Sequence, residues 1–282
     1  MSSNDLNIIY QPPGSAIWRT IVVTSGKGGV GKTTSTANLG LSVARMGYKV
    51  CVIDADVGLK NLDLLLGLER RIVYTGTDVL LGECDIHQAI VHDKRWYNLG
   101  LMEMSRIRQK YAVTPTAIST LVEEIHRSGY EFVFIDCPAG IDVGFVNAIT
   151  PATEAIIVTT PDITSVRDGD RVAGILESRR IRDIRLLINR VRTGMILGGD
   201  MMSVLDIQEI LGLPLLGAIP EDPQIIVSTN RGEPVVLSQK RNHVSISGVA
   251  YDTTAQRLIG KTDKVIDLKN PYKTIWNRVC GR

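Results

Sequence analysis

The sequence predicts an α/β fold with a doubly wound, mostly parallel sheet that is flanked by helices on both faces. Three observations predict it: short runs that are continuously apolar, helix-like segments between most of these runs, and a glycine-rich loop directly after the first run. Continuously apolar runs are typical of strands covered on both faces. Strands that alternate with helices are typical of a parallel sheet, with ligands at the carboxyl ends of its strands.

The elements follow from this pattern in chain order. Helices are expected at 33–46, 116–127, 165–177 and 202–211, and residues 62–111 are expected to form surface excursions because they are rich in Asp, His and Arg. One domain is expected over residues 19–262, between an N-terminal lead (1–18) and a C-terminal tail (263–282). Strands are expected at 20–24, 50–53, 132–135, 155–160, 184–188 and 215–219, with 98–102 as a further candidate.

Composition excludes several classes of protein. The 282 residues are 44% hydrophobic and 22% charged, which suffices for a sizeable core, and the net charge of +2 indicates neither a nucleic-acid nor a membrane partner. The cysteines at 51, 84, 137 and 280 lack the spacing of a metal site. No secretory signal or transit peptide is expected at the N-terminus, and no apolar run approaches the ~20 residues that span a bilayer.

The strongest motif is GKGGVGKT at residues 26–33, which fits the phosphate-binding pattern G-x-x-x-x-G-K-[ST] between a strand and a helix. Its glycines allow backbone N–H groups to point at phosphate oxygens, and the following helix adds its positive end. Lys32 is expected to reach the β- and γ-phosphates, and the Thr33 hydroxyl to hold Mg²⁺. The alternative is a glycine-rich turn without a ligand. The predicted nucleotide-binding residues here are Gly26, Lys27, Gly28, Gly29, Val30, Gly31, Lys32, Thr33 and Thr34.

Lys27 is a second lysine in the loop, directly after the first glycine, where an ordinary phosphate loop does not require one. A cation there could reach the phosphates of its own site or of a partner's site. The alternative is a solvated charge.

Carboxylates follow two of the expected strands. Asp54 and Asp56 leave the strand at 50–53, where a carboxylate can orient the attacking water or bind magnesium through water. Asp136 follows four apolar residues, a pattern typical of a Walker B strand, whose Asp helps to hold magnesium. The alternative for each is an acidic turn at a strand end. Thr33, Asp54 and Asp136 are therefore the predicted magnesium residues.

Weaker candidates lie at the ends of two further strands. Asn189 and Arg190 follow the strand at 184–188, and Pro220, Glu221 and Asp222 follow the strand at 215–219. A nucleotide base could be held at this edge of the sheet. Polar strand ends are common, however, so these residues alone carry little information.

Taken together, these motifs resemble the deviant Walker A family of ATPases, also called the ParA/MinD family. The marks are Lys27 within KGGVGKT, IDAD at 53–56 and IDCPAG at 135–140. The resemblance runs from about Thr20 to Asp267 and is closest to the branch that places the division site. Residues 189–192 and 201–204 resemble its cyanobacterial and plastid members, which favours the chloroplast stroma over a bacterial cytoplasm. Segments specific to the division-site branch are 53–74, 136–142, 164–172, 219–223 and 229–236.

The resemblance implies roles for single residues. Lys27 would cross a dimer interface to the partner's ATP, and Asp56 would position the attacking water, so that Lys27, Lys32 and Asp56 are the catalytic residues. Thr33, Asp54 and Asp136 would serve magnesium. The adenine would be surrounded by Asn189, Arg190, Pro220, Glu221 and Asp222.

The resemblance also implies a cycle with ATP and Mg²⁺ as cofactors. ATP builds a homodimer, the dimer binds a membrane (the inner envelope in a plastid, the inner membrane in a bacterium) and recruits a MinC-like division inhibitor. A MinE-like activator then triggers an otherwise slow hydrolysis. No specific nucleic acid is expected as a partner.

The chain departs from the bacterial pattern of this family at both ends. Its N-terminal lead is longer, and its C-terminal tail lacks the usual Phe/Leu-rich ending. Four apolar residues fall at helical spacing in the tail, and residues 269–282 carry basic but no acidic side chains. We expect a weak amphipathic membrane anchor that two copies would strengthen by avidity. The alternative is a frayed terminus or a helix docked on its own domain. The apolar residues are Tyr272, Ile275, Trp276 and Val279, and the basic ones Lys269, Lys273, Arg278 and Arg282.

Three other functions stay open. A ParA-type DNA-partition ATPase would need a basic surface, for which Arg179, Arg180, Arg182 and Arg185 are available. A redox protein like the nitrogenase iron protein would need a different arrangement of cysteines. The third is a nucleotide-binding scaffold that hydrolyses little.

Overall fold

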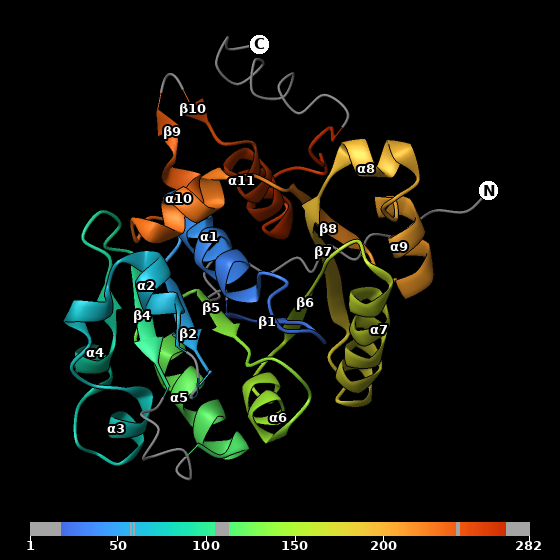
Figure 1. Ribbon diagram of the computed structural model, residues 1–282. Coiled ribbons are helices and arrows are strands. Elements are labelled where there is room, and N and C mark those ends of the chain that lie inside the picture. The colour runs from blue at the N-terminus through green and yellow to red at the C-terminus, as the bar shows by residue number, and fades with distance from the viewer. Residues whose placement is uncertain (1–17, 57, 59, 105–112, 241–242, 269–282) are drawn as a thin grey trace.

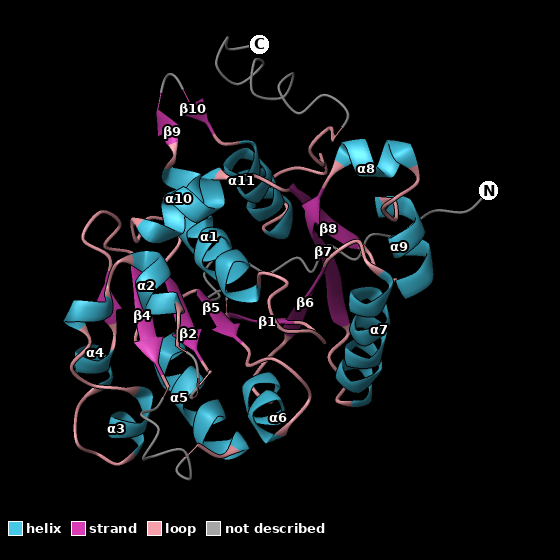
Figure 2. Ribbon diagram, viewed as in Figure 1, coloured by secondary structure: helices cyan, strands magenta, loops and turns pink. Residues whose placement is uncertain are grey.

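A computed structural model describes residues 18–56, 58, 60–104, 113–240 and 243–268. A single large sheet runs through the centre, with helices packed on both of its faces (Figures 1 and 2). The α/β fold predicted from the sequence is therefore confirmed.

All seven expected strands are present, because each run is rich in residues that pack well on a surface buried from both sides. They are β1 (Arg19–Thr24), β2 (Val50–Asp54), β4 (Leu99–Glu103), β5 (Phe132–Asp136), β6 (Glu154–Thr159), β7 (Asp183–Val191) and β8 (Leu215–Pro220). The structure adds β3 (Val91–His92) and a small hairpin of β9 (Gln239–Lys240) and β10 (His243–Val244).

The eight-stranded sheet has the order β3-β4-β2-β5-β1-β6-β7-β8. Neighbours pair in parallel, except that β3 runs antiparallel to β4. The chain crosses from one side of β1 to the other, with β5 and β6 as its two neighbours. The loop after β1 therefore lies at the switch point of the sheet, where ligands of such folds bind.

Strands β7 and β8 both extend beyond their expected ends. β7 continues through Asn189 and Arg190, so these residues lie within the strand and not after it. The register with β8 shifts between Ile188 and Val191, and Arg190 has a left-handed φ of 57°. This irregularity lets the strand continue past the point where its apolar run ends. β8 likewise includes Pro220 as its last residue.

The four expected helices are present within a few residues of their predicted bounds. Three of them begin with a side-chain cap, from Thr114, Asp162 and Ser203, whose oxygens accept hydrogen bonds from backbone N–H groups of the first turn. These helices are α1 (Lys32–Arg45), α5 (Pro115–Arg127), α7 (Ile163–Ser178) and α9 (Val204–Leu211). Outside residues 62–111, four further helices are present: α6 (Val143–Ile149), α8 (Thr193–Gly198), α10 (Gln224–Asn230) and α11 (Ile246–Leu258).

The segment expected as surface excursions is only partly at the surface. Arg70 and Arg71 are exposed, but Leu62, Leu66 and Thr75 are buried. The reason is that short helices pack their apolar sides onto the rest of the domain, and α3 also buries Asp78. The elements are α2 (Leu62–Leu66), the 3₁₀ turn η1 (Glu69–Arg71), α3 (Gly76–Leu80) and α4 (Ile86–Ala89).

Two apolar layers enclose the sheet. One face packs against α1 and α11, and the other packs against α5, α6 and α7 (Figure 2). The described residues contain no helix long and apolar enough to cross a membrane. After α11 the chain stays on the domain: Ile266 is buried, and the Thr193 hydroxyl donates to the carbonyl of Leu268 at 2.9 Å. The predicted membrane anchor, from Tyr272 to Val279, lies outside the described residues.

Candidate nucleotide site

The phosphate loop connects β1 to α1, and its glycines are required by its shape. Gly29 and Gly31 have φ values of 77° and 102°, a region that side chains disfavour. A Cβ at Gly31 would overlap the Asn189 side chain, and a Cβ at Gly26 would overlap the backbone of Asp168 in α7. The loop is therefore a narrow turn of bare backbone, which suits the close approach of phosphate oxygens.

Lys32 is the first residue of α1 and is buried. Its ammonium donates to Ser25 Oγ at 3.0 Å, and that hydroxyl donates to the carbonyl of Lys27 at 2.7 Å. Burial lowers the pKa of Lys32, and the nearby charge of Asp136 partly opposes this. Among the described residues no carboxylate forms an ion pair with this ammonium. A buried ammonium whose hydrogen bond goes to a neutral hydroxyl is suited to bind an anionic ligand that comes from outside the chain.

Asp54 and Asp136 end neighbouring strands and pair in register. Both carboxylates are buried. Burial raises the pKa of Asp54 to about 6 and that of Asp136 to about 7, and the charge of Asp54 contributes to the second shift. Hydroxyl hydrogen bonds from Thr33 and Thr36 act in the opposite direction on Asp136. Burial and mutual repulsion disfavour the ionised forms of these two carboxylic acids. A divalent cation placed between them would stabilise both carboxylates, so their position favours a metal ion.

The oxygen atoms of Thr33, Asp54 and Asp136 are better suited to Mg²⁺ than to a metal ion whose ligands all come from the protein. The described residues contain no group of three His, Cys, Asp or Glu side chains that could enclose a metal ion. Thr33 and Asp136 lie together, with Asp54 on the adjacent strand. Mg²⁺ is commonly bound by one or two side chains and completed by phosphate and water.

In the absence of nucleotide and Mg²⁺, replacing Asp136 with Asn should stabilise the folded protein at high pH. The folded-state pKa of Asp136, about 7, lies above the ordinary value of 3.8. The wild type therefore loses stability as pH rises between these values, and the neutral Asn does not. We expect the Asn variant to melt several degrees higher at about pH 8. The difference should nearly vanish at about pH 4, and a difference that grows toward low pH would contradict this origin.

Asp56 lies on the loop that leaves β2. Its N–H donates to Asp54 Oδ1 at 3.0 Å, and its own Oδ1 accepts from the N–H of Gly58 at 2.9 Å. Burial lowers the pKa of Lys32, and the charge of Asp56, like that of Asp136, partly opposes this shift, so the two side chains share one electrostatic environment. This places a partly exposed carboxylate at the same edge of the sheet as the phosphate loop.

Lys27 contacts the first turn of α7 within its own chain. Its ammonium lies 3.3 Å from Asp162 Oδ1 and 3.0 Å from Thr164 Oγ1. The side chains of Lys27 and Asp162 are each 45% exposed. Although burial acts in the opposite direction, hydrogen bonds from Thr160, Thr164 and the Ser165 N–H hold the pKa of Asp162 below its ordinary range. Lys27 is thus paired at the surface with the start of α7.

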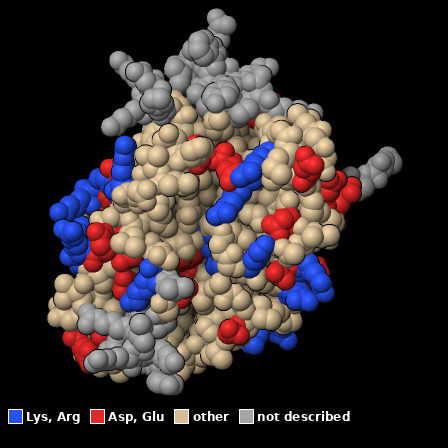
Figure 3. All heavy atoms as spheres, viewed as in Figure 1, with Lys and Arg blue, Asp and Glu red and all other residues tan. Residues whose placement is uncertain are grey.

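A cavity of about 280 Å³ opens beside the phosphate loop. Figure 3 shows basic and acidic side chains close together in the centre of this face. Arg192 forms an ion pair with Glu221 at its rim. Sequence reasoning missed Arg192 and Met201 as lining residues, although both lie in segments that carried the family resemblance. The lining residues are Lys27, Gly28, Gly29, Val30, Thr160, Pro161, Asp162, Arg190, Arg192, Met201 and Glu221.

The five residues predicted around adenine have different positions. Arg190 and Glu221 line the cavity. Asn189 is buried, and its amide donates to the carbonyl of Val30 at 2.7 Å, so it supports the phosphate loop from below. Asp222 accepts from the hydroxyls of Ser245 and Ser247 and thereby fixes the start of α11. Pro220 ends β8. The adenine contact itself stays a prediction.

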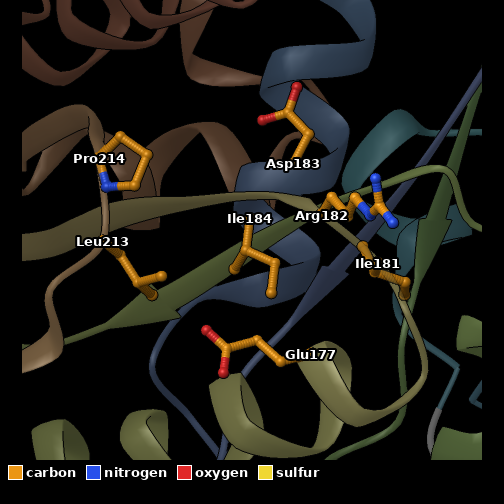
Figure 4. Close-up of a pocket in the computed structure, with 7 residues that line it drawn as sticks. All are labelled: Glu177, Ile181, Arg182, Asp183, Ile184, Leu213 and Pro214. Carbon is orange, nitrogen blue, oxygen red and sulfur yellow. The ribbon is translucent and has the colours of Figure 1, made fainter.

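A second cavity, of about 290 Å³, lies at the opposite edge of the sheet (Figure 4). It lies between the end of α7 and the start of β7, and its charged lining residues are Glu177, Arg182 and Asp183. Asp183 also forms an ion pair with Arg185 at 2.7 Å. The basic cluster that a DNA-partition function would use is therefore partly neutralised and remote from the phosphate loop.

Known proteins match this chain over most of its length. Residues 16–259 match the ParA family, described as NUBPL iron-transfer P-loop NTPase. A septum site-determining protein MinD of Oltmannsiellopsis viridis is 59% identical over 274 residues, which is 97% of this chain and 84% of that protein. The chloroplastic MinD homolog of Arabidopsis thaliana is 56% identical over 246 residues, covering 86% and 74% of the two chains.

Solved structures agree. MinD in a MinC:MinD cell division complex of Aquifex aeolicus is 45% identical with a TM-score of 0.80, covering 87% of this chain and 97% of that one. A septum site-determining MinD of Pyrococcus horikoshii, complexed with Mg-ADP, is 30% identical with a TM-score of 0.75, covering 87% and 99%.

Proposed function

Because the chain belongs to the MinD family of septum site-determining ATPases, within the ParA group of P-loop NTPases, we propose that it places the division site by switching its own assembly state with ATP. The protein is an ATPase that uses Mg²⁺, and it acts in division-site placement. The observation that carries the proposed switch is a phosphate loop with two lysines of different character: Lys32 is buried, whereas Lys27 lies at the surface.

Each part of the site would have one task toward ATP. The loop backbone and Lys32 would hold the phosphates. Mg²⁺ would be held by Thr33 and Asp136 with support from Asp54, and it supplies charge neutralisation of the phosphate oxygens. Asp56 would orient the water that attacks the terminal phosphate, because it is a partly exposed carboxylate at the same edge of the sheet.

Lys27 would join two copies. Its bonds to Asp162 and Thr164 are solvent-exposed, and exposed ion pairs of this kind contribute little stability, so the ammonium can exchange Asp162 for a partner's phosphate. Ile163 and Val143, 77% and 75% exposed, begin the two helices next to the loop at the same edge of the sheet. They offer apolar surface to a second copy, which supports a homodimer in the ATP state.

ATP should convert the wild type from monomer to dimer, and Lys27→Ala should abolish this change. The substitution removes the ammonium that would reach the partner's phosphates but leaves Lys32 in place. Light scattering with and without Mg-ATP measures the mass directly. Lys94→Ala, in an exposed loop at the far edge of the sheet, is the matched control and should dimerise like the wild type. A Lys27→Ala variant that dimerises normally would contradict the proposal.

Partners and location follow from the relatives named above. We propose that the ATP dimer recruits a MinC-like inhibitor, as the complex from Aquifex suggests, and that a MinE-like activator triggers hydrolysis. The chloroplastic homolog supports a plastid location, with the dimer bound to the inner envelope through the C-terminal tail.

The same light-scattering samples test the membrane step when anionic vesicles are added and sedimented. The full chain should sediment with vesicles in ATP, because two weak tails act together in a dimer. A chain that ends at Asn270 should still dimerise but remain in the supernatant. Equal sedimentation of both chains, regardless of nucleotide, would contradict the tail as an anchor.

A further inference from the structure

A third carboxylate ends a strand beside Asp54. Glu103 is the last residue of β4 and pairs in register with Asp54, on the side of β2 opposite Asp136. Its side chain is only 9% exposed, and Lys60 Nζ lies 2.5 Å from its Oε2. A contact this short between ammonium and carboxylate is a charge-assisted hydrogen bond, roughly twice as strong as a neutral one.

Lys60 belongs to the loop that carries Asp56. The loop begins after Asp54, and Lys60 comes two residues before α2 starts at Leu62. The carboxylate of Asp54 accepts from the N–H groups of Asp56 at 3.0 Å and of Asn61 at 3.2 Å, so β2 holds both ends of the loop. The Lys60 side chain adds an anchor on a different strand, β4.

The end of β4 is a firm attachment point. The N–H of Met104, the residue after Glu103, donates to the carbonyl of Asp54 at 3.0 Å. The carbonyl of Met104 in turn accepts from the N–H of Thr77 in α3 at 2.8 Å. The backbone next to Glu103 is thus bonded to both β2 and α3, so Glu103 is a fixed anchor for the Lys60 side chain.

We propose that Glu103 is a positioning residue for ATP hydrolysis, which fixes the loop carrying Asp56 through its ion pair with Lys60. This inference rests on the proposed role of Asp56. A displacement of about 1 Å in a group that orients the attacking water can cost about 100-fold in rate. The phosphates are bound by other residues, in the loop at 26–33. Loss of Glu103 therefore affects turnover and leaves ATP affinity intact.

Glu103→Gln tests the pair, because it keeps the shape of the side chain and removes its charge. With the full chain and Mg-ATP, maximal turnover should fall about 10- to 100-fold. ATP affinity and ATP-dependent dimerisation should change by less than about threefold. The exchanged pair, Lys60→Glu with Glu103→Lys, should recover part of the turnover because opposite charges again face each other.

Arg19 and Glu154 supply a matched control. Their ion pair is also 2.5 Å long, with side chains 21% and 12% exposed, against 21% and 9% for Lys60 and Glu103. It lies where β1 and β6 begin, at the edge away from ATP. Glu154→Gln should lower the melting temperature about as much as Glu103→Gln does, yet keep wild-type turnover.

Two results would overturn the role of Glu103: a turnover of Glu103→Gln within about twofold of the wild type, or an equal loss in Glu154→Gln. A wild type that shows no turnover at all would contradict the proposed function instead. The two failures are therefore distinguishable in one set of measurements.

Discussion

Lys32→Ala is expected to lose measurable affinity for Mg-ATP and at least about 1,000-fold of its ATPase activity. The Lys32 ammonium is buried beside Ser25, and no carboxylate in the described part of the chain pairs with it. Its electrostatic interaction with a phosphate would therefore be strong, because little water screens it. No other lysine of the described loop can replace it, since Lys27 is turned toward α7.

Binding is best measured by calorimetry and turnover by phosphate release. Because burial already lowers the pKa of Lys32, removing it relieves a desolvation cost, and the variant should remain folded in thermal melts. Lys94→Ala serves again as the control for loss of a charge. A folded Lys32→Ala protein that binds Mg-ATP within about tenfold of the wild type would refute the assigned role.

Asp56→Asn should separate binding from hydrolysis. The amide keeps the shape of the carboxylate but orients water poorly, so single-turnover hydrolysis should slow by about 100- to 1,000-fold. ATP binding should persist, because Asp56 is not part of the phosphate loop. The ATP dimer should therefore accumulate and remain long after the wild type has returned to monomers.

Quenched-flow phosphate release and light scattering on the same sample measure both effects. Asp63→Asn is a suitable control, because Asp63 lies in the next helix, α2, and its carboxylate accepts the N–H of Leu64. It should hydrolyse ATP at the wild-type rate. An Asp56→Asn dimer that decays as fast as the wild type would mean that another group positions the water.

Most of the fold could be predicted, because burial on both faces leaves a local trace in the sequence. The strands of the large sheet are continuous apolar runs, which a single sequence displays directly. α11 left no such trace. Its Ser247, Thr253 and Thr254 are buried, so polar residues interrupt the apolar stripe that would have marked it. β3 has only two residues and is too short to show any pattern.

Part of the candidate site could likewise be predicted from the sequence, and part of it could not. The phosphate loop is contiguous, and Asp54 and Asp136 end apolar strands that pair in register, so sequence and topology suffice to bring them together. The ion pairs are different. Lys27 and Asp162 are 135 positions apart, and Lys60 and Glu103 are 43 apart. Charged residues at such separations have many possible partners in the sequence, and only the folded chain selects among them.

The fixed position of α1 has a thermodynamic consequence. Its far end is bound to α11, since Ser42 and Arg45 both donate to Asp252 at 2.6 and 3.0 Å. Its near end is held through Asn189, which grips the loop at Val30. The receptor for the triphosphate is thus preorganised, and association forfeits little conformational entropy of the receptor itself. More of the favourable free energy of ATP binding therefore remains to offset the translational and rotational entropy that is lost when two copies dimerise.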